Sequence, residues 1–329
     1  MRESLANTVG GRLYHSRPGS WHQWAVLAGA VFMALLALVL PPFSLQQQFW
    51  IILVPVAVFG LSHGGADPFI LKRLVGERRQ ALCLAMLFYF FSSLIFLGLV
   101  WFFPVLALLV FLVLSIWHFG FTDAAYLSSS PRPLLTWLCG SLPVLGPVLG
   151  HTEQTSELFA WLIGREMSDV YGVLEIVGPL VAGLWIMGFG VLFYRYLYQP
   201  GHQTGARVLM ELALVGAALV LLPPLLAFTF YFCFVHSVRH FLSIAENRVG
   251  HRELKQVLGF LTRQSAPATL GAILLALLAW GTIVLWTPAP SLLVEGVRVM
   301  FWGLAALTLP HGFIVSLWWG RDFRVVPAQ

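Results

Sequence analysis

Residues 81–100 read ALCLAMLFYFFSSLIFLGLV, a run of twenty residues without a charged side chain. A helix of about 20 apolar residues is long enough to cross the hydrocarbon core of a bilayer. Similar runs recur on both sides of this one, separated by short stretches rich in charge, Pro or Gly. The composition agrees, because 59% of the 329 residues are hydrophobic and 10% are charged. The sequence therefore predicts an all-α protein, a polytopic bundle of transmembrane helices.

Cutting the chain at these breaks predicts about ten membrane spans. The expected spans lie near residues 23–41, 49–66, 81–100, 102–122, 133–150, 170–194, 207–222, 225–245, 268–287 and 297–319. The division at Pro223-Pro224 is open, since two consecutive prolines fit either a tight turn between two spans or a kink inside one long helix. Eight to ten spans are therefore compatible with the sequence.

The basic residues predict how the bundle sits in the membrane. The chain has 19 Lys and Arg against 14 Asp and Glu, and nearly all the basic residues fall in alternate gaps between the expected spans. Arg165 and Arg298 fall on the other side. Under the positive-inside rule, this split predicts a cell inner membrane protein with both termini in the cytoplasm. The basic excess is thereby explained by topology, and no nucleic-acid partner is expected. The expected parts are a cytoplasmic segment over 1–22, the bundle over 23–319 and a cytoplasmic tail over 320–329.

Five histidines interrupt the apolar segments. They occur in LSHGGAD (His63), IWHFG (His118), VHSVRH (His236 and His240) and LPHG (His311). Such a side chain inside a membrane is costly unless it faces protein, water or a metal. Counting 1.5 Å per residue along the expected spans puts all five in one layer of the cytoplasmic half. His236 and His240 share one helix face, while Arg239 points elsewhere. The sequence therefore predicts one buried histidine site.

The residue types around these histidines favour a transition metal. Imidazole suits Fe, Zn and Cu, whereas Ca and Mg prefer oxygen ligands. Asp67 and Asp123 each follow a histidine by four or five residues, so we expect them to orient imidazoles or offset the charge of the ion. A metal-free alternative is open, because a membrane-embedded histidine often joins helices through a hydrogen bond. Five further histidines lie in polar or loop contexts and are expected to be solvated or interfacial: His15, His22, His151, His202 and His251.

Together these motifs resemble a known family. The set HGGAD at 63–67, WHFG at 117–120, HSVRH at 236–240 and PHG at 310–312 is similar to that of the bacterial and archaeal Brp/Blh membrane proteins, the beta-carotene 15,15'-dioxygenases that supply retinal to rhodopsins. The resemblance covers about residues 50–319. It implies a non-haem iron(II) enzyme that cleaves the central double bond of beta-carotene with O2 and yields two retinal molecules. Beta-carotene, O2, membrane lipid and a rhodopsin that receives retinal are the implied partners.

The resemblance also implies roles for individual residues. The implied iron ligands, which are also the catalytic residues, are His63, His118, His236 and His240. His311 matches a further histidine motif, and its role is left open between a ligand, a residue that orients a ligand and a part of the pocket wall. Asp67, Asp123 and Trp117 are expected beside the ligands in the same supporting positions.

Two other functions stay open at this point. A diiron membrane lipid desaturase or hydroxylase also uses histidines near the cytosolic face, but such enzymes carry repeated HxxHH boxes, and this chain has a single HxxxH and no adjacent histidine pair. A transporter whose histidines bind a metal ion or relay protons is the second alternative. Transporters often contain inverted halves, and no such self-similarity is evident here.

Overall fold

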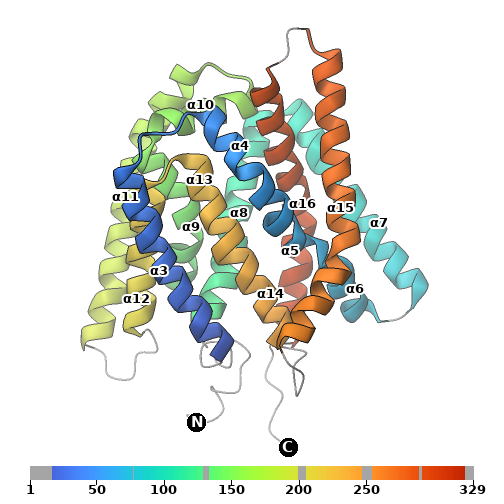
Figure 1. The fold of residues 1–329 in the computed structure, drawn as a ribbon, viewed down its shortest axis with the longest axis horizontal. Coiled ribbons are helices and arrows are strands. Elements are labelled where there is room, and N and C mark those ends of the chain that lie inside the picture. Colours follow the sequence, from blue (N-terminus) through green and yellow to red (C-terminus); the bar gives the residue numbers. More distant parts are fainter. Residues whose placement is uncertain are drawn as a thin grey trace, which may run out of the picture.

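A computed structural model describes residues 17–76, 78–128, 133–198, 205–246, 254–288 and 291–322. Within these ranges every regular element is a helix, which confirms the predicted all-α bundle (Figure 1). In chain order the helices are α3 (Arg17–Val39), α4 (Leu45–Pro55), the π-helical η1 (Val56–Gly60), α5 (Leu61–Gly65), α6 (Asp67–Val75), α7 (Arg79–Phe102), α8 (Pro104–Leu127), α9 (Pro133–Gly150), α10 (Thr152–Ile163), α11 (Met167–Tyr198), α12 (Ala206–Leu221), α13 (Pro224–Thr229), the π-helical η2 (Phe230–His236), α14 (Ser237–Glu246), α15 (Leu254–Trp286) and α16 (Leu292–Asp322).

The span count agrees with the predicted range. Nine helical segments of the described chain are long and apolar enough to cross a membrane. Helix α12 is shorter, with 16 residues, but it packs along α3 and α9 inside the bundle. The chain reverses between α12 and α13 at Pro223, whose backbone is extended (φ −52°, ψ 148°). The two prolines therefore form a turn between two helices, and the alternative of one long kinked helix is wrong.

Successive spans run in opposite directions, so α3 begins and α16 ends at the same end of the bundle (Figure 1). Basic residues gather at this end of the described helices, on α6, α7, α11 and α12. Arg165, just after α10, and Arg298, near the start of α16, lie at the opposite end. The alternation of charge predicted from the sequence is thus present in the fold. Which end faces the cytoplasm stays a prediction.

Several helices extend beyond the spans expected from apolar residues. Helix α3 begins at Arg17, inside the segment expected to precede the first span, and the second span continues past residue 66 to Val75. Helices commonly continue for a turn or more into polar residues at a membrane surface, so hydropathy alone underestimates their length. Three of the histidines expected to be solvated or interfacial lie outside the described residues: His15, His202 and His251.

His22, which was expected to be solvated or interfacial, is half-buried. It lies in α3 with Nε2 3.0 Å from the backbone carbonyl oxygen of Phe234 in η2. His151 is half-buried and makes a similar contact, with Nε2 3.1 Å from the carbonyl oxygen of Leu221. Each imidazole thereby links two helices. A carbonyl oxygen inside an apolar bundle has no water to bond with, so the histidine serves as its hydrogen-bond partner.

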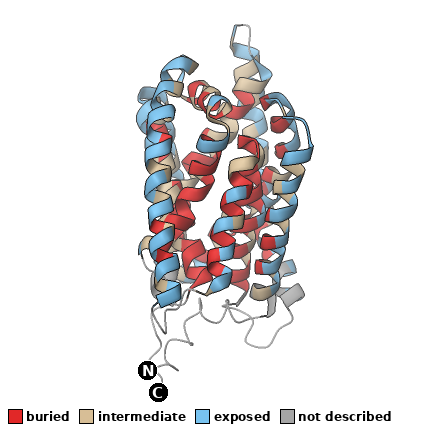
Figure 2. Cartoon of the chain, turned by 90° about the vertical axis from the view of Figure 1, so that its left-hand side faces the viewer, coloured by how far each residue is buried: buried red, intermediate tan, exposed pale blue. Residues whose placement is uncertain are grey.

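The bundle has charged groups inside and large apolar side chains outside. Trp101, Leu285 and Trp286 are more than 80% exposed, whereas Glu211 and Arg239 are buried. Figure 2 shows the buried residues in the interior and the exposed ones along the outer faces. An apolar exterior of this extent is unfavourable in water and favourable in lipid. The exposed apolar side chains therefore support the membrane assignment independently of composition.

Glycines allow the closest helix crossings. A Cβ atom at Gly140 of α9 would overlap the carbonyl oxygen of Ile116 on α8, and one at Gly120 of α8 would overlap that of Thr136 on α9. Small residues let helix backbones approach in this way inside membranes. Because His118 lies between Ile116 and Gly120, this crossing fixes the position of one site residue.

Candidate metal centre

The five histidines of the apolar segments come together inside the bundle. They lie on α5 (His63), α8 (His118), η2 (His236), α14 (His240) and α16 (His311), and each is at most 7% exposed. The ring centroid of His311 is 4.7 Å from that of His63, 4.8 Å from that of His118 and 5.3 Å from that of His240. The centroids of His118 and His236 are 4.9 Å apart. Four spans thus bring five imidazoles into one cluster.

The spacing of the ring nitrogens matches that of metal ligands. Nε2 of His118 lies 3.2 Å from Nε2 of His236. Two imidazole nitrogens bonded to one ion at about 2.1 Å are about 3.0–3.4 Å apart. One ligand nitrogen from each of His63, His118 and His311 also lies within 4.8 Å of the others. These separations suit nitrogens that surround a single ion.

Hydrogen bonds orient two of the rings toward the cluster. Nδ1 of His63 donates to the carbonyl oxygen of Gly60, and Nδ1 of His311 lies 2.8 Å from Oδ1 of Asp67. Carbonyl and carboxylate oxygens only accept, so both Nδ1 atoms carry the proton and both Nε2 atoms keep a lone pair. Tyr89 of α7 donates to Oδ2 of Asp67 at 2.9 Å, which holds this carboxylate in place. Metal-binding histidines are commonly held by such partners.

A second carboxylate stands beside His236. Oδ1 of Asp123 lies 3.4 Å from Nδ1 of His236, and the hydroxyl of Tyr231 donates to Oδ2 of Asp123 at 2.6 Å. Arg239 lies 3.9 Å from Asp123 and pairs with Glu211 of α12. All five side chains are buried. A buried charge is costly without a partner, so this chain of contacts keeps the Asp123 carboxylate compensated.

Four of these supporting residues were not singled out as site residues from the sequence: Tyr89, Tyr231, Arg239 and Glu211. The structure confirms that Arg239 points away from the imidazoles and adds that it meets Glu211. Glu211 is a charged residue inside an expected span, and the rule that intramembrane charges find partners could have revealed this pair. The tyrosines carry no comparable signal, because an uncharged tyrosine near the end of a span is also explained by the membrane interface.

Three ring nitrogens of the cluster lack a hydrogen bond within the described part of the chain. They are Nδ1 and Nε2 of His240 and Nε2 of His311, all buried. An unpaired buried polar atom costs about 1–3 kcal/mol. A neutral imidazole has one lone pair and one N–H, so a metal ion in the cluster could satisfy Nε2 of His311 and one nitrogen of His240.

Two π-helical segments help to set the direction of the rings. Segment η1 follows Pro55 and is followed by the short helix that carries His63, and η2 ends at His236. The two segments contact each other. One extra residue in a helical turn rotates all later side chains by about 100°, and such turns are frequent at functional sites. The sequence predicted regular helices here, so this local geometry was missed.

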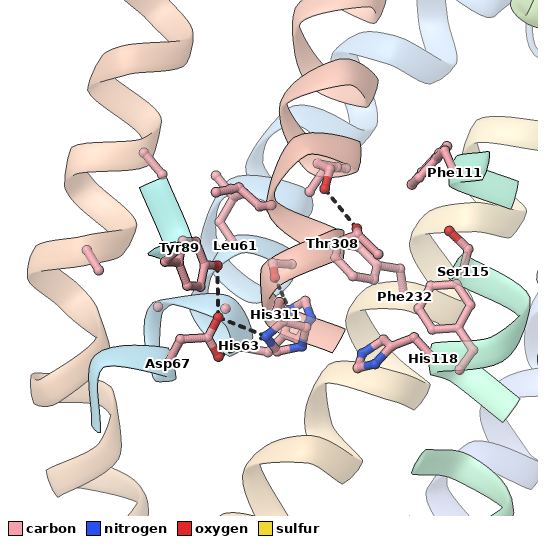
Figure 3. Close-up of a pocket in the computed structure, with 18 of the residues that line it drawn as sticks. Leu61, His63, Asp67, Tyr89, Phe111, Ser115, His118, Phe232, Thr308 and His311 are labelled. Carbon is pink, nitrogen blue, oxygen red and sulfur yellow. Dashed lines mark hydrogen bonds and ion pairs between the residues drawn. The ribbon is translucent and has the colours of Figure 1, made fainter. Parts of the chain in front are cut away.

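A largely apolar cavity opens beside the imidazoles. It contains about 950 Å³ of space free of protein atoms, counting the part that is open to the exterior. Figure 3 shows His63, His311 and His118 in its central part, with Tyr89 and Asp67 on one side and Phe111 and Ser115 on the other. The cavity can therefore bring an apolar molecule against the histidine cluster.

The remaining site candidates lie at different distances from this cavity. Asp67 lines it, whereas Asp123 lies behind His236. Trp117 is 42% exposed and packs over Gly312 instead of forming part of the cavity wall. Gly64, next to His63, faces open space in the cavity. The glycines that follow the histidines therefore serve packing at Gly312 and leave room at Gly64.

A family model described as Beta-carotene 15,15'-dioxygenase matches residues 54–319, a range that contains all five clustered histidines. The chain belongs to this family. Membership assigns it to the carotenoid-cleaving dioxygenases and confirms the resemblance of the histidine motifs.

Two relatives illustrate the similarity. A protein of Halobacterium salinarum named "Probable beta-carotene 15,15'-dioxygenase Blh" is 30% identical to this chain, over 93% of each sequence. A protein of the uncultured marine bacterium 66A03 named "Beta-carotene 15,15'-dioxygenase" is 28% identical, over 81% of this chain and 92% of its own length. No solved structure matches the chain.

Proposed function

We propose that this protein uses a histidine-bound iron(II) ion to cleave beta-carotene at its central 15,15' double bond with O2. The observation that carries the proposal is the cluster of five buried imidazoles, from four spans, beside an apolar cavity in a member of this family. One carbon–carbon double bond and the bond of O2 are replaced by two carbonyl groups. The products are two molecules of retinal.

The donor set fits a divalent transition metal. Neutral imidazoles keep the charge of the ion intact, and the buried Nε2 of His311 and one nitrogen of His240 are available as further ligands. The four histidines of the family motifs would hold the iron: His63, His118, His236 and His240. The geometry adds His311, whose Nε2 points to the same cluster while Asp67 holds its Nδ1. Bound iron would supply the activation of O2 that an apolar polyene requires.

The protein orients the substrate and provides a cavity that excludes water. The cavity is bordered by Phe111, Phe119 and Phe232, so an apolar polyene replaces little water when it binds. These walls restrict the polyene to a few orientations, and a fixed orientation beside the imidazoles selects one double bond. Asp67 and Tyr89 hold a proton at Nδ1 of His311 and so keep that ring in the required tautomer.

The cell inner membrane is the proposed location, with both chain termini in the cytoplasm and lipid around the outer faces. The exposed apolar surface of α7 and α15 supports this placement. A carotenoid dissolves in the same lipid, and retinal stays in it, so a rhodopsin in that membrane would be the receiver of the product.

Metal analysis of the purified protein together with product analysis tests the proposal. We expect one iron per chain and conversion of beta-carotene to retinal under oxygen. His236→Ala and His240→Ala should abolish both iron retention and retinal formation, and His311→Ala should lower iron retention. His251→Ala, outside the described residues, is the control and should change neither. Two irons per chain would instead favour a diiron enzyme, and full activity of the His236→Ala, His240→Ala double variant would refute the site.

A further inference from the structure

A second cavity lies next to the one that contains the histidines. It lies between α8, α9, α10, α13 and α16 and contains about 620 Å³ of space free of protein atoms, counting the part that is open to the exterior. Both cavities are lined by the same four residues: Phe111, Ser115, Phe119 and Phe228. The two spaces are therefore neighbours, separated by a wall that consists of three aromatic rings and one hydroxyl group.

The histidine cavity reaches the outer face of the bundle. Among its described lining residues, Met86 of α7 and Ala268 of α15 are exposed, and the others are buried or half-buried. Helices α7 and α15 both pack against α16 and α6. The exposed side of the cavity thus lies at α7 and α15, two of the most exposed spans of the described bundle.

We call the second cavity the inner chamber because its lining residues are little exposed. Every described residue that lines it is buried or half-buried, including Leu158 of α10 and Val144 of α9. Its polar groups are few, and the hydroxyl of Thr155 already donates to the carbonyl oxygen of Pro147 at 2.9 Å. An apolar space without convergent polar groups does not hold water well. Its chemistry suits a hydrocarbon.

The histidines lie between the opening and the shared wall. In Figure 3, Tyr89 of α7, the helix that also provides Met86, stands on one side of His63 and His311, and Phe111 stands on the other. An elongated molecule that enters between α7 and α15 therefore passes the imidazoles before it reaches the wall. A molecule that is cut at its middle needs room on both sides of the reacting bond.

We propose that the inner chamber binds the half of the carotenoid farther from the opening, and that Phe228 is the movable part of the wall. This inference rests on the proposed function. Phe228 is half-buried and contacts Phe232 and Phe301, with ring centroids 5.1 and 5.2 Å away. Rotation of its ring joins the two cavities into one tunnel with the imidazoles along its length. The depth of the chamber then sets the longest half that the enzyme accepts.

Filling the chamber tests this assignment. Leu158→Trp places an indole in the chamber, away from the imidazoles, and Leu184→Trp is the matched control because Leu184 of α11 is 53% exposed to the exterior. Two substrates are compared: beta-carotene, and an apocarotenal that keeps one ring and the central double bond but has a shortened far end. We expect Leu158→Trp to lower kcat/KM for beta-carotene by about tenfold or more, with the apocarotenal within about twofold of the unaltered protein.

The outcomes distinguish a failure of the chamber assignment from a failure of the proposed function. Iron content and the unfolding temperature are measured for each variant, and Val144→Phe provides a second obstruction from another helix. An equal loss for both substrates in a folded, iron-containing variant, or no loss for beta-carotene, would overturn the role of the chamber. Failure of the unaltered protein to cleave either substrate would instead refute the proposed function.

A labelling experiment on the unaltered protein needs no substitution. A carotenoid with a photoreactive diazirine on one ring is bound under anaerobic conditions, so that it is not consumed, and is then irradiated. We expect mass spectrometry to find adducts in peptides from α10, around Leu158, as well as in peptides from α7 and α15. Adducts confined to α7 and α15 would show that the far half stays outside the chamber and would overturn the inference.

Discussion

At the scale of single residues, the carboxylates do more than offset charge. Asp67 accepts from both His311 and Tyr89, so the carboxylate joins α16, α6 and α7 at one point. Asp123 of α8 contacts His236, Tyr231 and Arg239, which all lie on the span formed by η2 and α14. Asp67 thus fixes its imidazole relative to two further helices, and Asp123 fixes its imidazole relative to one. The orientation of the rings depends on these contacts as much as on the helices that carry the histidines.

Asp67→Asn tests this dependence. An amide can donate to Nδ1 of His311 or accept from it, so the ring loses its enforced tautomer, and the negative charge near the proposed ion disappears. We expect iron affinity to fall by about 10–100-fold, as is typical for the loss of a residue that supports a metal ligand. The measurement is the dissociation constant for iron in detergent. Asp169→Asn is the control, since Asp169 is exposed at the start of α11. Equal affinity of the two variants would contradict the role of Asp67.

The histidines and aspartates of the site could be predicted from the sequence, whereas the residues that contact the aspartates could not. The histidines stood out because they are rare inside apolar spans, and Asp67 and Asp123 because they follow a histidine closely. The contacts of Tyr231 with Asp123 and of Arg239 with Glu211 join residues that are 108 and 28 positions apart. Only the packing of helices brings these residues together, so their spacing along the chain does not predict the contacts.

At the scale of helices, the crossing of α8 and α9 decides where His118 lies. Alanine normally stabilises a helix relative to glycine by roughly 0.5–1 kcal/mol. At Gly140 the added Cβ would overlap the carbonyl oxygen of Ile116, so we expect Gly140→Ala to lower the free energy of unfolding by about 1–3 kcal/mol. At Gly183 of α11 a Cβ meets nothing within 4 Å, and Gly183→Ala should not lower stability. Thermal unfolding in detergent compares the two. A loss at both positions would argue against a specific contact at Gly140.

The helical register could be predicted from apolar periodicity only where the helices are regular. Apolar periodicity did not predict η1 or η2, because a π-helical turn uses the same apolar residues as an α-helical one. Pro55 was the available signal, since proline removes a backbone N–H from the helix. The turn at Pro223-Pro224 illustrates the same limit, because the residues allowed both a turn and a kink until packing showed the reversal.

At the scale of the whole molecule, the alternation of basic residues predicts which end of the bundle faces the cytoplasm. Reporter fusions test this orientation. Alkaline phosphatase, which is active only outside the cytoplasm of a bacterium, should be inactive after Ser128 and active after Gly164 and after Leu222. Activity after Leu222 would also support a crossing of the membrane by α12, which is 16 residues long. The reverse pattern of activities would refute the predicted orientation.

The inner chamber has a kinetic consequence. In the proposed binding mode the far half of the carotenoid enters past the imidazoles, and the reverse of this path is the exit for the retinal formed in the chamber. The aldehyde nearer to the lipid departs first, and the enclosed aldehyde can follow only afterwards. Release is therefore sequential, and the trapped product competes with the next carotenoid for the same passage. Turnover in a membrane would slow as retinal accumulates, so the enzyme would limit its own output wherever nothing withdraws the aldehyde from the bilayer.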